Sequence, residues 1–418
     1  MKKLVSLFLV LAMFLSLTPA LAEEPVTVEL WYCVAGANGD RMENIIAAYN
    51  ASQDKVVVKG VYQGDYLPTL AKVKTSIAGG TIPCDILMIG SEYCIQLYEE
   101  DILVNLNPYF EKTNVNYDDF IEGLAYYFRD TEGNQYGIPF GRSTPALFVN
   151  TDMLAELGAE VPTTWDAMQE LCKKAIAYDA NGEQSRYGWA MAADEWYWLG
   201  FLASHGVQLL NDEQTALGCV EDGSLKRAVT RLQEMYQAGE ILITPTSDGT
   251  VPMQAWAEGK SLFFTWSVAG IGSVRNLVEF NWNIATMPAD QKIAVPTGGN
   301  GLAILDGTGK EDAAYDFIHW LMTDPNGALY FVTETGYYPF TYSMAESEAI
   351  QQYFAEVPGA KVAFDQLQYA DDSGYYCNKL AEIRNALNVL MEAVIFDGAD
   401  VQEQIDIMAE SVADALAD

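Results

Sequence analysis

Strand and helix patterns alternate along the N-terminal part of the chain, which leaves few folds open to it. Apolar and polar residues alternate from Val26 to Tyr32 and again from Lys55 to Val61, as they do in half-buried strands. Apolar residues recur at helical spacing from Arg41 to Asn50 and from Asp65 to Ala78, and a short apolar strand follows from Asp85 to Ile89. This order predicts a largely parallel sheet with helices on its faces.

Open parallel sheets bind ligands at the carboxyl ends of their strands. In this chain, those ends are followed by G-D-Y at residues 64–66 and by G-S-E at residues 90–92. We therefore expect these two loops to border a binding site.

The stretch from Gly137 to Trp165 has the character of a strand that crosses between two bodies. It is apolar and β-branched from Ile138 to Val149, with a break at G-R-S-T-P, and a helix begins after it at Thr151. Polar side chains in the middle of such a crossing, here Arg142 and Ser143, face a cleft where small ligands bind. An ordinary core strand with one turn explains the segment equally well.

Bulky aromatic residues gather shortly after this crossing, at Trp189 and in the run Trp196-Tyr197-Trp198. Aromatic rings stack on the apolar faces of sugars and also attract cations, so a cluster beside a cleft would suit a polyol ligand. Packing in a core is the alternative, and the sequence leaves both open.

Length and charge restrict the classes of protein further. A chain of 418 residues is long for one hydrophobic core and suits two domains. Its formal net charge of -35 argues against nucleic acid and anionic membranes as partners. The G-K-S at residues 259–261 lacks the earlier glycine of a phosphate-binding loop, because Gln254 stands there. We expect no nucleotide and no other cofactor.

The cysteines and histidines do not have the spacing of a metal site. There are two histidines, and no C-x-x-C pair occurs. Cys84 and Cys94 are the nearest two cysteines, and export would permit a disulfide, although small buried thiols are the commoner state. The sequence leaves the pairing open.

The N-terminus reads as a signal peptide. Lys2 and Lys3 precede an apolar run from Leu4 to Leu17, and A-L-A at residues 20–22 supplies the small residues that a signal peptidase reads. Cleavage is expected near Ala22, without a lipid anchor, which predicts an exported protein that is periplasmic or extracellular.

Several motifs in a fixed order resemble the family 1 extracellular solute-binding proteins of ABC importers, which share the two-lobed fold of maltose-binding protein. They are S-T-P-A-L-F-V-N-T-D followed by P-T-T-W, A-W-A-E-G-K-S-L-F-F, V-P-T-G-G-N-G-L-A-I and T-G-Y-Y-P-F-T. Within the family, the chain looks most like the branch that binds sn-glycerol 3-phosphate and its diesters. That branch shares G-x-Y, S-T-P, the paired glycines, T-G-Y-x-P and I-R in a late helix.

The resemblance implies a set of ligand contacts. Arg384 would hold an anionic group, and Trp196 or Trp198 would cover the carbon skeleton. The residues implied as donors to polar oxygens are Tyr66, Ser143, Gly299 and Tyr337.

Departures from the branch add further candidates. Ser91, with Glu92 beside it, stands where the branch has a Glu that takes hydroxyls, and Ser267 is the nearest replacement for a second branch serine. Arg142 would give a second phosphate contact, select a different sugar, or pair with a surface carboxylate.

The resemblance implies an α/β fold of the two-lobed periplasmic-binding-protein type II, in which each lobe is a mostly parallel sheet flanked by helices and the ligand cleft lies between the lobes. Lobe 1 would comprise residues 23–142 and 297–336, and lobe 2 residues 143–296 and 337–418. The expected protein is a monomer and not an enzyme. It would capture a small polyhydroxylated ligand and deliver it to the permease subunits of an ABC importer. A secreted glycoside hydrolase or lyase is the alternative, but no motif picks out the pair of carboxylates that such an enzyme needs.

Overall fold

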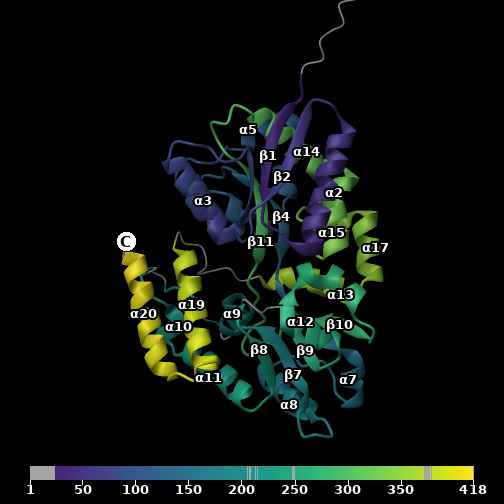
Figure 1. The fold of residues 1–418 in the computed structure, drawn as a ribbon, viewed down its shortest axis with the longest axis vertical. Helices are drawn as coiled ribbons and strands as arrows, with labels where there is room; N and C mark the ends of the chain where they lie inside the picture. The colour runs from purple at the N-terminus through teal and green to yellow at the C-terminus, as the bar shows by residue number, and fades with distance from the viewer. Residues whose placement is uncertain are drawn as a thin grey trace, which may run out of the picture.

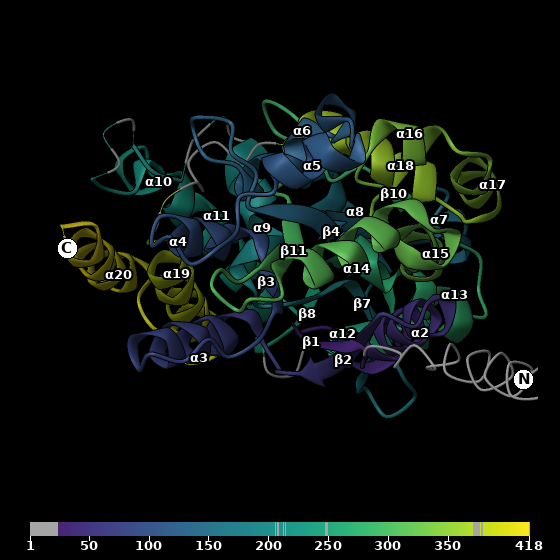
Figure 2. The same cartoon turned by 90° about the horizontal axis from the view of Figure 1, so that it is seen from above.

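The computed structural model describes residues 24–417 apart from residues 205, 207–208, 212, 214, 247–249, 371–376 and 378. The predicted signal peptide lies outside the described residues. Figure 1 shows two bodies stacked along the long axis, each built around its own sheet, with the C-terminal helices beside the lower one. Figure 2 gives the view along that axis.

The first sheet has five strands in the order β2-β1-β3-β11-β4. Successive side chains of a strand point to opposite faces, and both faces are covered by helices. Val28, Leu30 and Met88 pack in the cluster that includes residues of α2, whereas Trp31 and Leu87 pack in the cluster that includes residues of α3. The strands are β1 Val26–Tyr32, β2 Val56–Tyr62, β3 Ile86–Gly90, β4 Gly137–Ser143 and β11 Gly298–Ile304, and the helices are α2 Gly36–Ser52, α3 Tyr66–Ala78 and α14 Glu311–Thr323.

The second sheet has the order β10-β5-β9-β7-β6, and β8 pairs with β7. Its side chains alternate in the same way: Leu147 and Val149 enter one apolar cluster, and Ala146 and Phe148 enter the other. The strands are β5 Pro145–Asn150, β6 Ala177–Tyr178, β7 Gln184–Ala192, β8 Ile241–Thr244, β9 Ser261–Ser267 and β10 Trp282–Ala285. Its principal helices are α8 Trp165–Ala175, α9 Glu195–Ser204, α11 Ser224–Gln237, α12 Thr250–Ala257, α19 Leu380–Ile395 and α20 Val401–Ala417.

The α/β class and the two sheets agree with the prediction, but the expectation of mostly parallel sheets was wrong. Among the described strands, β1 is parallel to β2 and β3, and β7 is parallel to β8 and β9. The other named pairs are antiparallel. For the pairs that involve β5 or β11, the reason is the direction of entry: both strands enter their sheets from the side where the two bodies meet, and so run against strands that end there.

The chain passes between the sheets at the S-T-P motif. β4 ends at Ser143 in the first sheet and β5 begins at Pro145 in the second, so only Thr144 lies between them. The Thr144 hydroxyl lies 2.7 Å from the Tyr338 hydroxyl and accepts a hydrogen bond from Gln366 Nε2 at 3.0 Å. The Thr144 hydroxyl is therefore satisfied although the residue is fully buried.

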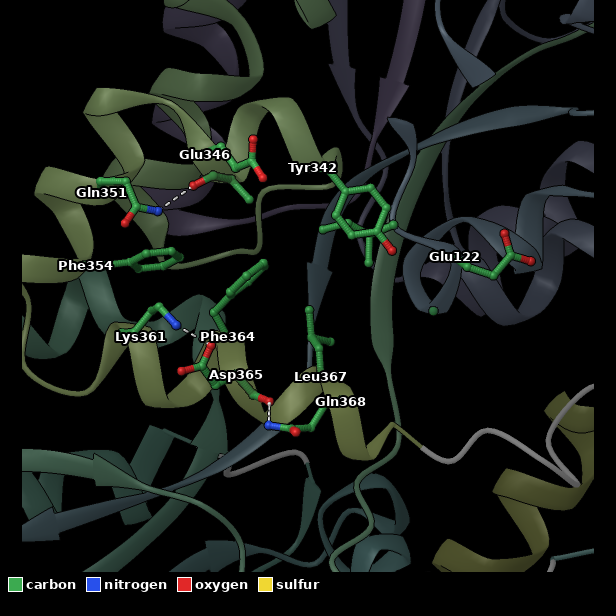
Figure 3. A pocket seen from close by; sticks show the side chains of 13 residues that line it. Glu122, Tyr342, Glu346, Gln351, Phe354, Lys361, Phe364, Asp365, Leu367 and Gln368 are labelled. Carbon is green, nitrogen blue, oxygen red and sulfur yellow. Dashed lines mark hydrogen bonds and ion pairs between the residues drawn. The ribbon is translucent and has the colours of Figure 1, made fainter. Parts of the chain in front are cut away.

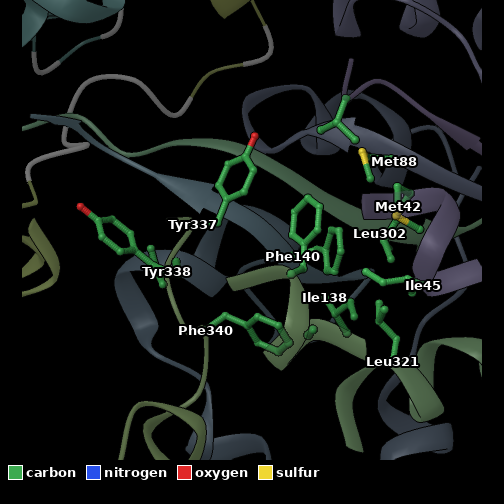
Figure 4. Packing of buried hydrophobic residues seen from close by; sticks show 14 of the residues in the cluster. Met42, Ile45, Met88, Ile138, Phe140, Leu302, Leu321, Tyr337, Tyr338 and Phe340 are labelled. Atoms are coloured by element: carbon green, nitrogen blue, oxygen red, sulfur yellow. The ribbon is translucent and has the colours of Figure 1, made fainter. Parts of the chain in front are cut away.

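An apolar cluster continues from the first sheet across this junction into the second. Figure 4 shows Ile138 and Phe140 of β4 packed among Met42, Leu302 and Phe340, while the Tyr337 hydroxyl points away from them. The same cluster reaches Trp256 on the far side, which has no exposed surface. The two bodies thus share packing where the chain crosses.

Shorter helices complete the described fold. They are α4 Cys94–Tyr98, α5 Asn107–Thr113, α6 Glu122–Ala125, α7 Thr151–Glu156, α10 Gly218–Glu221, α13 Ile271–Leu277, α15 Tyr330–Thr335, α16 Tyr342–Glu346, α17 Glu348–Glu356 and α18 Ala360–Asp365. No helix in the described part combines the length and apolarity needed to cross a membrane.

Candidate functional site

A cavity of about 340 Å³ lies where strands of the two sheets end facing each other. Its lining from the first body comes from the turns after β2 and β3, the end of β4 and the start of β11. The second body adds the turn after β7, the first turn of α9, the end of β9 and one side chain of α19, and Tyr337 comes from the segment that follows α15. The lining residues are Asp65, Tyr66, Leu67, Glu92, Tyr93, Ser143, Asp194, Trp196, Ser267, Gly298, Gly299, Tyr337 and Arg384.

Tyr66 reaches the cavity from the first turn of α3. Its hydroxyl accepts a hydrogen bond from Asn300 Nδ2 at 3.0 Å, and Asn300 Oδ1 accepts one from the Gly141 N–H at 3.1 Å. Burial raises the pKa of Tyr66 well above its ordinary value. The phenol therefore keeps its proton and can donate a hydrogen bond into the cavity.

Trp196 forms the aromatic wall from the side of the second sheet. Asp194 Oδ1 accepts a hydrogen bond from the Trp196 N–H at 2.9 Å, and the indole Nε1 donates to the Thr297 carbonyl at 3.2 Å. A Cβ on Gly298 would stand 2.8 Å from the indole ring, so the absence of a side chain lets the ring lie against the backbone. The side chain of Trp198, the other predicted tryptophan, lies outside the described residues.

Gly299 is held in a backbone conformation that favours glycine. Its φ is +95°, and a Cβ there would stand 2.0 Å from the Gly141 carbonyl oxygen. The paired glycines thus allow β11 to approach β4 closely at the floor of the cavity. The paired glycines of the V-P-T-G-G-N motif belong to a strand, since β11 begins at Gly298.

Arg384 enters the cavity from α19 and is surrounded by carboxylates. Its Nη1 donates to Glu92 Oε1 at 2.5 Å, its Nε donates to Glu195 Oε1, and its Nη2 lies 3.9 Å from Asp194 Oδ1. Glu92 belongs to the first body, whereas the other three residues belong to the second. The ion pair between Arg384 and Glu92 therefore joins the two bodies across the cavity.

The buried carboxyl of this group has a perturbed pKa. The Glu195 side chain has no exposed surface, and burial raises its pKa, although the charge of Arg384 acts in the opposite direction. For Arg384, burial disfavours the charged form, but Glu195 and Glu92 hold its pKa well above the ordinary value. Because the Arg384 guanidinium is shared among several carboxylates, the most buried of them, Glu195, is able to keep its proton.

Two predicted contact residues, Arg142 and Ser91, do not line the cavity. Arg142 is fully buried, and its guanidinium donates to the Gly298 carbonyl at 2.6 Å, to Thr297 Oγ1 at 3.0 Å, to the Leu124 carbonyl at 3.1 Å and to Ser91 Oγ. Strand geometry explains the difference: Ser143 points into the cavity, so the preceding side chain points to the other face. The prediction that Arg142 faces the cleft does not agree with this arrangement.

The structure brings together most of the other residues expected from the sequence. Tyr337 lies with its ring stacked on Phe331, at a centroid distance of 5.4 Å. Ser267 Oγ accepts a hydrogen bond from the Ala269 N–H at 3.2 Å. The predicted residues that line the cavity are Tyr66, Glu92, Ser143, Trp196, Ser267, Gly299, Tyr337 and Arg384.

Sequence reasoning missed Asp65, Tyr93 and Asp194. Asp65 and Tyr93 adjoin predicted positions in the two strand-end loops, and Asp194 precedes the aromatic run by two residues. A wider reading of those loops would have included Asp65 and Tyr93, and a wider reading of the aromatic run would have included Asp194.

A second hollow, of about 620 Å³, lies between α6 and the helices α16 to α18 (Figure 3). Polar groups on its wall are already engaged locally: Lys361 pairs with Asp365 at 2.5 Å, and Gln351 donates to the Ala345 carbonyl at 2.8 Å. Aromatic side chains such as Phe354 and Phe364 form much of the rest. Its lining also combines aromatic, acidic and basic side chains, but its one basic group, Lys361, is paired with a carboxylate of the same helix.

The described residues contain no cluster of His, Cys, Asp and Glu that could hold a metal ion. All six cysteines are free thiols, and burial raises the pKa of those at 84, 94 and 172.

Comparisons with known proteins agree with this architecture. Residues 44–358 match the family described as bacterial extracellular solute-binding protein. The sn-glycerol-3-phosphate-binding periplasmic protein UgpB of Yersinia pestis is 26% identical over 394 residues, covering 88% of this chain and 87% of the relative. UgpB of Salmonella typhimurium is 24% identical over 402 residues, with 91% and 90% covered.

Solved structures share the fold. UgpB from Mycobacterium tuberculosis, in complex with glycerophosphocholine, superposes with a TM-score of 0.80 at 20% identity, covering 94% of this chain and 98% of the other. The GacH receptor of Streptomyces glaucescens gives 0.81 at 19% identity, with 95% and 100% covered. Since the family match spans most of the sequence, the chain belongs to the bacterial extracellular solute-binding proteins.

Proposed function

We propose that this protein is the substrate-binding component of an ABC importer and that it captures a ligand of the carbohydrate class, either a sugar, an oligosaccharide, or glycerol 3-phosphate or one of its diesters. The observation that carries the proposal is the cavity between the sheets, where Trp196, Tyr66 and Tyr337 meet carboxylates and one guanidinium. Apolar rings that cover C–H faces, together with a few fixed polar groups, are what a polyol needs.

The proposed mechanism is closure of two lobes around the ligand. Lobe 1 would be residues 23–142 and 297–336, and lobe 2 residues 143–296 and 337–418. The chain would then cross between the lobes three times, at the S-T-P motif, before residue 297 and after residue 336, and these crossings would form the hinge. A ligand that touches both lobes only in the closed form shifts the population toward that form. The importer would then recognise the closed form.

Further proposed properties follow from the same assignment. The chain is exported after cleavage near Ala22, acts as a monomer and is not an enzyme. UgpB of Y. pestis, named as a periplasmic binding protein, supports export and binding. The alternative of a glycoside hydrolase or lyase has no support among the relatives and solved structures described above.

Isothermal titration of residues 23–418 against sugars, oligosaccharides and glycerophosphodiesters tests the proposal. At least one ligand should bind saturably. In a thermal unfolding experiment, a ligand at 100 times its dissociation constant should stabilise the fold by about 2.7 kcal/mol. Trp196→Ala should weaken that binding by about tenfold, because it removes a stacking face.

Trp320→Ala is the matched control, since Trp320 is also half-buried but lies in α14 and does not line the cavity. It should leave the affinity unchanged. Absence of saturable binding, or turnover of a glycoside that a single carboxylate substitution abolishes, would contradict the proposed function.

A further inference from the structure

The cavity carries more negative than positive charge. Asp65, Glu92 and Asp194 place three carboxylates in its lining, against the single guanidinium of Arg384. Arg142, buried beneath the floor, adds one positive charge, and the buried Glu195 adds at most one negative charge. The balance is negative whether or not Glu195 holds a proton.

The guanidinium at the cavity is already occupied. Arg384 donates to Glu92 and to Glu195, and its remaining Nη2 faces Asp194 at 3.9 Å. An incoming phosphate would have to draw the guanidinium away from both carboxylates, and it would then face Glu92 and Asp194 directly. This arrangement disfavours a ligand with negative charge.

The carboxylates, in contrast, have capacity left for a donor. The Asp65 carboxylate makes no ion pair or hydrogen bond with any described residue, and it is exposed at the cavity. Asp194 accepts a hydrogen bond from the Trp196 N–H through the oxygen that faces Arg384, and its carboxylate also interacts with the Glu195 carboxyl. Trp196 and Tyr66 add aromatic faces, which attract a cation within about 6 Å of the ring centre.

We propose that the cavity selects a cationic polyol, one that carries a protonated amine among its hydroxyls, and that it excludes phosphate monoesters. Arg384 is then a positioning residue, which holds Glu92, Asp194 and Glu195 in place. The inference rests on the proposed function and narrows its ligand.

Sets of probes that share one polyol and differ in charge test this directly. One set is glucose, glucosamine and glucose 6-phosphate; another is cellobiose and the corresponding β-1,4-linked glucosamine disaccharide; a third is glycerol 3-phosphate and glycerophosphocholine. In at least one of the two sugar sets, the amine should bind about tenfold tighter than the neutral sugar, a difference of about 1.4 kcal/mol. Phosphate monoesters should bind at least about tenfold more weakly than the neutral member.

Charge variants identify the source of the preference. Asp194→Asn and Glu92→Gln should each reduce the preference for the amine and leave the neutral sugar less affected. Asp166→Asn is the control, because Asp166 is an exposed carboxylate that pairs with Arg231 outside the cavity. Raising the ionic strength from about 0.01 M to about 1 M, which shortens the Debye length from about 30 Å to about 3 Å, should also shrink the preference.

The outcomes separate this inference from the proposed function. If neutral sugars bind as tightly as amines, the inference is wrong while the proposed function stands. The same holds if phosphate monoesters bind tightest and Arg384→Met abolishes their binding. If no member of any set binds saturably, the proposed function fails and the inference fails with it.

Discussion

Replacing Arg142 by Met should destabilise the fold, because its guanidinium holds the floor of the cavity together. The side chain has no exposed surface and donates to two backbone carbonyls, of Leu124 and Gly298, and to two hydroxyls, of Ser91 and Thr297. The hydroxyls can rotate toward other partners, whereas each carbonyl loses its donor in a buried place. Leaving a buried acceptor unsatisfied costs about 1–3 kcal/mol. Two carbonyls therefore give a loss of about 2–6 kcal/mol, which is reduced because the variant no longer has to bury a charge.

Chemical denaturation of the ligand-free protein measures this loss. Arg231→Met is the matched control, because Arg231 makes a salt bridge with the exposed Asp166 and such surface pairs contribute about 0–1 kcal/mol. If Arg142→Met kept the stability of the natural protein and lost only ligand affinity, Arg142 would be a ligand contact and the structural role would be wrong.

Three further predictions concern single positions. Gly299→Ala should sharply weaken ligand binding and lower the unfolding midpoint, because its Cβ would meet the Gly141 carbonyl at 2.0 Å; an unchanged midpoint would contradict the close approach. Burial raises the pKa of Glu195 from 4.5 to about 8, so the folded state holds its proton more tightly and stability falls as pH rises across that window. In denaturation between pH 4.5 and 8, Glu195→Gln should become progressively more stable relative to the natural protein, whereas a stability difference that stays constant across this range would show that Arg384 keeps Glu195 ionised. Trp256 is buried, and its Nε1 has no hydrogen-bond partner among the described residues. Trp256→Phe should therefore lower the free energy of unfolding clearly less than Trp256→Ala, for which we expect a loss of about 3–5 kcal/mol. Equal losses in denaturation would refute this.

The local spacing of apolar residues and turn residues was enough to predict strands such as β1 and β2 and the loops that border the cavity. Alternation of apolar residues in β1 and β2 reflects the covered faces of the first sheet, and the turns after β2 and β3 supply Tyr66 and Glu92 as expected. These features depend on residues close in sequence, which is why periodicity reveals them.

Features that depend on distant segments were not predicted. The mixed sheets arise because β5 and β11 enter from the junction of the two bodies, which no local pattern encodes. The side-chain direction of Arg142 depends on which face of β4 meets the cavity. The group around Arg384 joins Glu92 and Glu195, which lie 292 and 189 residues away, so composition alone gives no sign of it.

A crystal structure with the tightest-binding member of the ligand panel is the most direct test of the central claim. We predict that the ligand lies between the two sheets, against Trp196 and Tyr66, with its polar groups on Glu92 and Asp194. A ligand found in the hollow lined by Tyr342 and Phe354, with the cavity between the sheets empty, would contradict the account.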